Sequence, residues 1–220
     1  DNLLQNAELA NFPILAANIT DKISGELKFK DHVIFEKGDF KVGVFGLDTP
    51  EAMTKTHPDK VRGITFAAGE ELYACAQAQV DALKEAGCNL IVCVGHLGVD
   101  DESTGNRSID VIANTTGIDA VLDAHSHSTI AGELVLNKDG EEVLLSSTGT
   151  KLEALGSLTI TEDADGALVL ETELHTEKLF QDDDMTTYVE GIKAQYAETL
   201  NQVVAHSDVD LIINDPTAVD

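Results

Sequence analysis

Apolar residues form three nearly continuous runs in the first 130 residues of the chain. Runs of this kind are typical of strands that are covered on both faces of a parallel sheet. The runs are residues 41–47, 90–95 and 120–124. The second run ends at His96, and the third leads into His125 and His127. The chain therefore places histidines at the ends of two predicted strands.

Helical patterns fill the intervals between these runs. Residues 67–88 predict a helix that Gly87 ends, and residues 108–118 predict a shorter helix that Gly117 closes. Four apolar residues share one face of the longer helix: Leu72, Ala76, Val80 and Leu83. The order strand, helix, strand, helix, strand predicts an α/β fold with parallel pairing and right-handed crossovers.

The flanking segments predict mixed sheets and terminal helices. We expect hairpins at 32–48, 133–148 and 154–179, helices at 1–10 and 182–204, a short buried strand at 12–20 and an irregular surface segment at 49–66. The carboxylates of Asp182, Asp183 and Asp184 suit the positive end of the last helix dipole. No stretch approaches 18 uninterrupted apolar residues, so no membrane span is expected.

Charge restricts the partners of this chain. Its 40 acidic residues against 14 basic ones give a net charge of −26. A nucleic acid or an anionic membrane surface would be repelled by this field. A small phosphate ester could still bind where multivalent cations neutralise it locally. The three cysteines, Cys75, Cys88 and Cys93, form no CxxC pair and are expected to be buried free thiols.

Histidines at the carboxyl ends of neighbouring strands predict a metal site. Ligands collect there in parallel sheets, and neutral imidazole is a preferred ligand of zinc, manganese, iron and nickel. If the segment stays extended, His125 and His127 point the same way, so one strand offers two imidazoles beside His96. Asp123 could orient an imidazole or serve as a turn or helix-dipole partner, and both interpretations stay open.

Two other classes of site lack their motifs. The sequence has no GxxxxGK[ST] phosphate loop and no GxSxG nucleophile elbow. P-loop nucleotide hydrolysis and serine hydrolase chemistry therefore have no support.

Five motifs together resemble a known family. They are VGVFGLDTPE, KTHPDKVRGITF, VGHLGVDD, GIDAVLDAHSHS and STGTKLEALGSLTI. In this order and spacing they are similar to the 5'-nucleotidase and 2',3'-cyclic-nucleotide phosphodiesterase group of calcineurin-like metallophosphoesterases. Ala124 stands where the family has a glycine before the first histidine of its last motif.

The resemblance implies a dinuclear metal site that hydrolyses phosphate esters of nucleotides. His96 and His125 would bind one divalent ion, and His127 would bind the other, with Zn, Mn, Fe, Ni or Co as candidates. The implied fold is the four-layer α/β/β/α metallophosphatase sandwich. Export to the periplasm, the cell wall or the medium is expected, because family members are usually exported.

The same resemblance predicts that the chain is part of a longer protein. The family's Asp-x-His, Gly-Asp and Gly-Asn-His motifs are absent from residues 1–30, and the chain opens with DNLLQ rather than Met. Residues 1–185 would be the second half of the catalytic domain, without the acid–base and bridging residues. Residues 186–220 would be a helix and linker to an absent nucleotide-binding domain. We expect the isolated chain to be inactive, and to associate with the missing half or with itself.

Two alternatives remain. An amidohydrolase or PHP-type barrel also uses an Asp-x-His-x-His motif, but there it ends the first strand, whereas here it begins only at Asp123. A non-catalytic metal-holding or surface module is the other alternative.

Overall fold

The computed structural model describes residues 2–177 and 181–209. The chain divides into two units, Asp1–Thr176 and Glu177–Asp220, and each is described by itself. The first unit carries the sheets and the candidate ligands His96, His125 and His127, and the second carries one helix.

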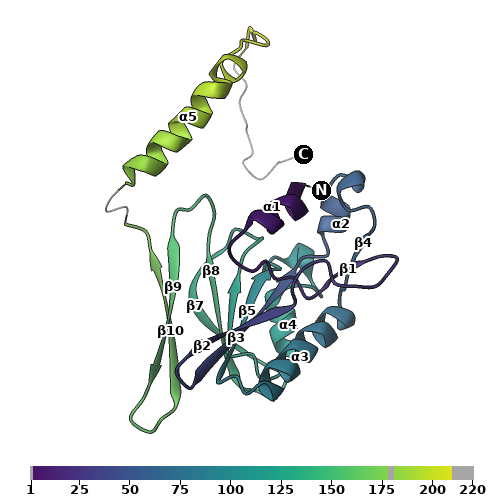
Figure 1. Cartoon of the computed structure of the whole chain (residues 1–220), viewed down its shortest axis with the longest axis vertical. Helices are drawn as coiled ribbons and strands as arrows, with labels where there is room; N and C mark the ends of the chain where they lie inside the picture. Colours follow the sequence, from purple (N-terminus) through teal and green to yellow (C-terminus); the bar gives the residue numbers. More distant parts are fainter. Residues whose placement is uncertain (1, 178–180, 210–220) are drawn as a thin grey trace. The chain divides into compact units, whose positions relative to one another are not determined.

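A six-stranded mixed sheet forms the centre of the first unit (Figure 1). In spatial order its strands are β2 (His32–Lys37), β3 (Phe40–Asp48), β5 (Leu90–His96), β6 (Ala120–Asp123), β8 (Glu142–Thr148) and β7 (Thr129–Leu136). The four central strands are parallel, and the two edge strands pair antiparallel to their neighbours. The predicted α/β class with mixed sheets is confirmed, and this open sheet excludes the barrel alternative for the described residues.

Helices α3 (Glu70–Glu85) and α4 (Ser108–Asn114) cover one face of this sheet, which we call the helix face. The four apolar residues predicted for one side of α3 are all fully buried there. They pack against β3, β5, β6 and β8 through Phe45, Cys93, Val121 and Leu145, among others. Gly87 follows the C-cap of α3 with φ +77°, a conformation that favours glycine and ends the helix.

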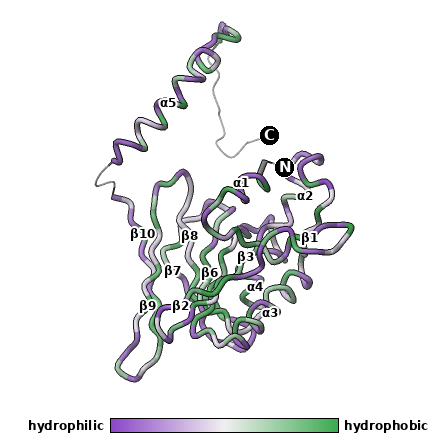
Figure 2. Tube along the Cα trace, viewed as in Figure 1, coloured by the Kyte–Doolittle hydropathy of each residue, from purple (hydrophilic) through white to green (hydrophobic). Residues whose placement is uncertain are grey.

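The hairpin of β9 (Leu155–Glu162) and β10 (Leu168–His175) covers part of the opposite face, which we call the hairpin face. Leu158 and Leu170 pack there against Leu90, Val92 and neighbouring residues of the central sheet. Figure 2 shows hydrophobic residues concentrated on the central strands between these two layers. The hairpin face is covered incompletely, and four large apolar side chains on it stay exposed: Phe35, Val94, Leu134 and Leu136.

The smaller elements differ from the sequence expectation in two places. The first unit also contains α1 (Asn2–Leu9), β1 (Ile19–Asp21), α2 (Ala52–Lys55), β4 (Ile64–Phe66) and 3₁₀ turns at Pro58–Lys60 and Asp101–Ser103. The strand predicted at 12–20 is wrong for most of its length, since Phe12 is exposed and Leu15 forms only an isolated bridge with Lys30. Residues 16–19 are buried as expected, and the last residues pair with β4. The irregular segment at 49–66 contains α2 and β4 because short elements escape periodicity analysis.

The three cysteines are free thiols. Cys93 is fully buried on the helix face, and Cys75 and Cys88 are half-buried. Burial raises the pKa of each thiol. The expectation of buried free thiols holds fully for Cys93, whereas Cys75 and Cys88 are only partly buried.

The second unit contains α5 (Asp183–Leu200). The Asp182 side chain caps it by accepting a hydrogen bond from the Met185 amide at 2.7 Å. The last part of the expected linker, residues 210–220, lies outside the described residues. Across the described parts of the chain, no helix has the length and apolar character needed to cross a membrane.

Candidate metal centre

His96 occupies the carboxyl end of a central strand. It is the last residue of β5, and its register partner on β3 is Asp48. The strand places its side chain on the hairpin face at an exposed position. This is where a parallel sheet presents ligand-binding groups.

His125 does not lie on a strand. β6 ends at Asp123, and both His125 and His127 adopt positive φ angles, +80° and +56°. The extended i, i+2 arrangement expected for these two histidines is therefore wrong. Non-glycine residues in this region of φ are strained and concentrate at functional sites.

The turn after β6 nevertheless brings two imidazoles together. His125 Nδ1 lies 3.3 Å from His96 Nε2, and the ring centroids are 5.0 Å apart. Two unprotonated nitrogens at this distance would repel each other unless a proton or a cation lies between them. Two nitrogens that share a tetrahedral zinc at 2.0–2.1 Å would lie about 3.3 Å apart. The donor pair therefore fits two coordination positions of one metal ion.

His127 stands apart from this pair. Its side chain is exposed. Within residues 2–177 and 181–209, no three His, Cys, Asp or Glu side chains are grouped closely enough to hold one ion. Assignment of His127 to a second ion therefore stays a prediction.

Glu51 also belongs to the site, although the sequence alone did not single it out as a candidate. Its Oε2 lies 2.8 Å from His125 Nε2, on the side of the ring opposite His96. Hydrogen bonds from Lys55, then Ser103 and His125, hold the pKa of the Glu51 carboxyl at about 2. The available signal was the TPE motif, which follows β3 directly.

Asp123 acts on the backbone beside His96. Its Oδ1 accepts hydrogen bonds from the amides of Leu97 (3.0 Å) and Gly98 (3.3 Å), and its Oδ2 accepts one from Ser108 Oγ (2.6 Å). The carboxylate is buried and bonds to no histidine nitrogen in the described structure. These contacts tie the β5 end to the start of α4, as expected of a turn and helix partner, and an orienting role toward an imidazole stays a prediction.

Gly98 allows the two strand ends to approach. Its φ is +77°, and a Cβ built there would lie 3.2 Å from His125 Cδ2 and from Ser126 Cβ. Only glycine meets both conditions without strain. The second glycine of the GHLG segment therefore keeps room for the His125 ring.

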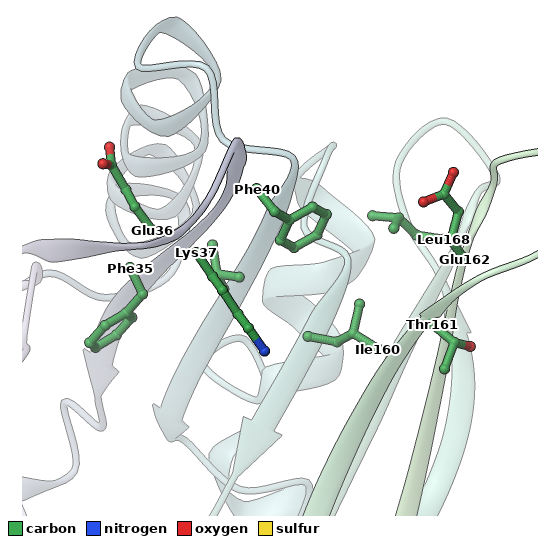
Figure 3. A pocket seen from close by; sticks show the side chains of 9 residues that line it. Phe35, Glu36, Lys37, Phe40, Ile160, Thr161, Glu162 and Leu168 are labelled. Atoms are coloured by element: carbon green, nitrogen blue, oxygen red, sulfur yellow. The ribbon is translucent and has the colours of Figure 1, made fainter.

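An apolar groove of about 430 Å³ lies at the other end of β3. Phe40, Ile160 and Leu168 line it from β3, β9 and β10, with Lys37 beside them (Figure 3). It contains no histidine, and it adjoins the turn of the β2–β3 hairpin rather than the end that carries His96. The histidine pair is therefore the candidate site.

Comparison with known proteins found similar sequences and similar structures, although no family model matches the chain. The chain is 30% identical over 140 residues to a 5'-nucleotidase of Vibrio vulnificus. This alignment covers 60% of the chain and 25% of that protein. The chain thus spans about a quarter of the length of this curated relative.

Two solved structures share the fold. The 5'-nucleotidase precursor of Thermus thermophilus matches with a TM-score of 0.71 and 25% identity, over 96% of this chain and 43% of that one. A calcineurin-like phosphoesterase of Bacillus subtilis matches with a TM-score of 0.64 and 22% identity, over 88% of this chain and 65% of that one. The resemblance to the 5'-nucleotidase group of calcineurin-like phosphoesterases is thereby confirmed in sequence and in fold.

Proposed function

We propose that this chain is part of a metal-dependent phosphoesterase that hydrolyses nucleotide phosphate esters. In this proposal His96 and His125 bind one divalent ion, and His127 binds a second. The observation that carries it is the 3.3 Å separation of His96 Nε2 and His125 Nδ1 at the ends of adjacent strands. The likeness to 5'-nucleotidases supports the reaction class.

The residues present make specific contributions to such a reaction. A bound divalent ion would polarise a phosphoryl oxygen and lower the pKa of water. His96 and His125 offer the nitrogens that hold it, and Glu51 holds the far side of the His125 ring. Asp123 fixes the backbone that follows His96. A chain with a net charge of −26 would need such cations to retain an anionic ester.

We expect the 220-residue chain by itself to bind one ion weakly and to show no turnover. Two imidazole nitrogens fill only half of a tetrahedral site, and a dinuclear pair needs carboxylates that bridge and neutralise the ions. The complementary ligands would come from the N-terminal half that the sequence resemblance implies. We also propose that the protein acts outside the cytoplasm, and the description of one structural relative as a precursor supports this.

Metal titration of this chain tests the proposal directly. Isothermal titration calorimetry with Zn²⁺ or Mn²⁺ should give one binding event that His96→Ala or His125→Ala weakens at least about tenfold. His57→Ala is the matched control, because the His57 side chain is 72% exposed and its recorded partner is Asp59 rather than either histidine of the pair. Equal binding by all four proteins, or no binding by the wild type, would contradict the assigned ligands.

A phosphate-release assay separates the enzyme from the alternative. The chain alone should release no phosphate from a nucleoside monophosphate above background. Addition of the N-terminal half of the catalytic domain should restore metal-dependent release. Metal binding without release under that condition would favour a non-catalytic metal-holding module.

A further inference from the structure

We propose that Glu51 is a positioning residue that holds the His125 imidazole as its Nε2–H tautomer, leaving the Nδ1 lone pair facing His96. The consequence for metal binding rests on the proposed function. The statement about the tautomer concerns only residues of this chain and stands independently.

Glu51 is placed for this role by the segment that follows β3. It lies at the N-cap of α2, and only 13% of its side chain is exposed. Its Oε1 accepts a hydrogen bond from Ser103 Oγ at 2.7 Å, and Lys55 Nζ lies 2.9 Å from Oε2. Held on both sides, the carboxylate presents Oε2 to His125 Nε2 at 2.8 Å.

This contact decides which ring nitrogen carries the proton. A carboxylate only accepts hydrogen bonds, so His125 Nε2 must be the donor. In a neutral imidazole the other nitrogen, Nδ1, then keeps its lone pair. Nδ1 is the atom that lies 3.3 Å from His96 Nε2. The two ends of the His125 ring are therefore used for different purposes.

An imidazole fixed in this way is a better metal ligand. A carboxylate that accepts the distal N–H orients the ring and raises the basicity of the ligating nitrogen. A non-glycine residue at positive φ, such as His125 with φ +80°, persists only where surrounding contacts hold it, and the hydrogen bond to Glu51 is one such contact. Without Glu51, the ring could rotate or shift its proton to Nδ1 and lose its lone pair toward His96.

Long-range ¹H–¹⁵N correlation spectra of the metal-free chain test the tautomer. At a pH where His125 is neutral, the wild type should show a protonated Nε2 and an unprotonated Nδ1. Glu51→Ala should give a mixture of tautomers, and Glu51→Gln should keep Nε2–H in part, because its amide oxygen still accepts a hydrogen bond. A wild-type spectrum with the proton on Nδ1 would overturn the proposal.

Zn²⁺ titration then measures the consequence. Glu51→Ala should weaken binding about 10- to 100-fold, with a smaller loss for Glu51→Gln. Glu102→Ala is the matched control, since Glu102 also pairs with Lys55, at 3.2 Å, but its side chain is 80% exposed. Equal losses at Glu51 and Glu102 would show a bulk charge effect and refute positioning. If the wild type binds no metal, the proposed function fails while the spectra still decide the tautomer.

Discussion

On the helix face of the six-stranded sheet, Phe45, Leu83 and Ile112 are fully buried beneath α3 and α4. On the hairpin face, Val94 keeps 37% of its surface exposed and Phe35 keeps 54%. Both faces are built from the same apolar strands, so the difference lies in what covers them. Two helices close one face, whereas a single hairpin covers only part of the other.

The comparison shows that the two faces have different roles in this unit. Burial of apolar surface is the main stabilising contribution to folding, and it is concentrated on the helix face. His96 is the last residue of β5 and lies exposed on the hairpin face, where that face is not covered. Substitutions on the two faces should therefore differ sharply in their effect on the free energy of unfolding.

Leu83→Ala should have the largest effect. The side chain is fully buried between α3 and the sheet, and its truncation leaves a cavity on the helix face. We expect a loss of about 4 kcal/mol in the free energy of unfolding. Urea denaturation followed by circular dichroism measures it. A loss below about 1 kcal/mol would show that the helix face is not the stabilising one.

Asp123→Ala should follow, at about 3 kcal/mol, because it leaves the amides of Leu97 and Gly98 without their acceptor and removes a buried hydrogen bond from Ser108 Oγ. Ser108→Ala removes one of these hydrogen bonds and should cost only about 1 kcal/mol. Amide hydrogen exchange at Leu97 and Gly98 provides a local measurement. Unchanged protection of these amides in Asp123→Ala would contradict the assigned contact.

Gly46→Ala probes the place on β3 where the backbone of Leu15 approaches closely. A Cβ there would clash with the carbonyl oxygen of Leu15, which is backbone and cannot rotate away. We expect a loss of about 2 kcal/mol in thermal or urea unfolding. Leu15→Ala should not rescue the variant, and full rescue would show that the side chain rather than the carbonyl is in the way.

Val94→Ser should have the smallest effect. This side chain stands on the uncovered part of the hairpin face, and exposed positions of this kind change stability by less than about 0.5 kcal/mol. A clearly larger loss in the chain alone would mean that this surface is buried in solution, by a second copy or another part of the molecule. Sedimentation at two protein concentrations then identifies self-association.

Hydrophobic periodicity predicted most of the first unit, because the buried residues of its helices and strands recur at regular spacing along the chain. Leu72, Ala76, Val80 and Leu83 recur at helical spacing, so the residues that contact the sheet could be named in advance. The segment at 12–20 was misassigned because its apolar residues pack singly rather than as a paired strand. A β-bridge and a three-residue strand carry too little pattern to be recognised.

The chemistry of the site was only partly predictable. Histidines at two strand ends could be read directly, as could their candidate role as ligands. The backbone conformation at His125 and His127 could not be predicted. An extended apolar run carries no signal that φ becomes positive one residue past its end. Glu51 lies 74 residues from His125, and only the fold brings the two together.

The sequence by itself determined the strand and helix order, the face of α3 that is buried, and the histidines that stand at the sheet's carboxyl edge. These follow from local periods of hydrophobicity and from the rule that parallel strands end at one edge. Tertiary structure alone decided that His125 Nδ1 faces His96, that Glu51 takes the other nitrogen, and that Asp123 binds amides rather than imidazoles. Hydrogen bonds depend on atoms meeting within about 3 Å, and no local pattern encodes that meeting.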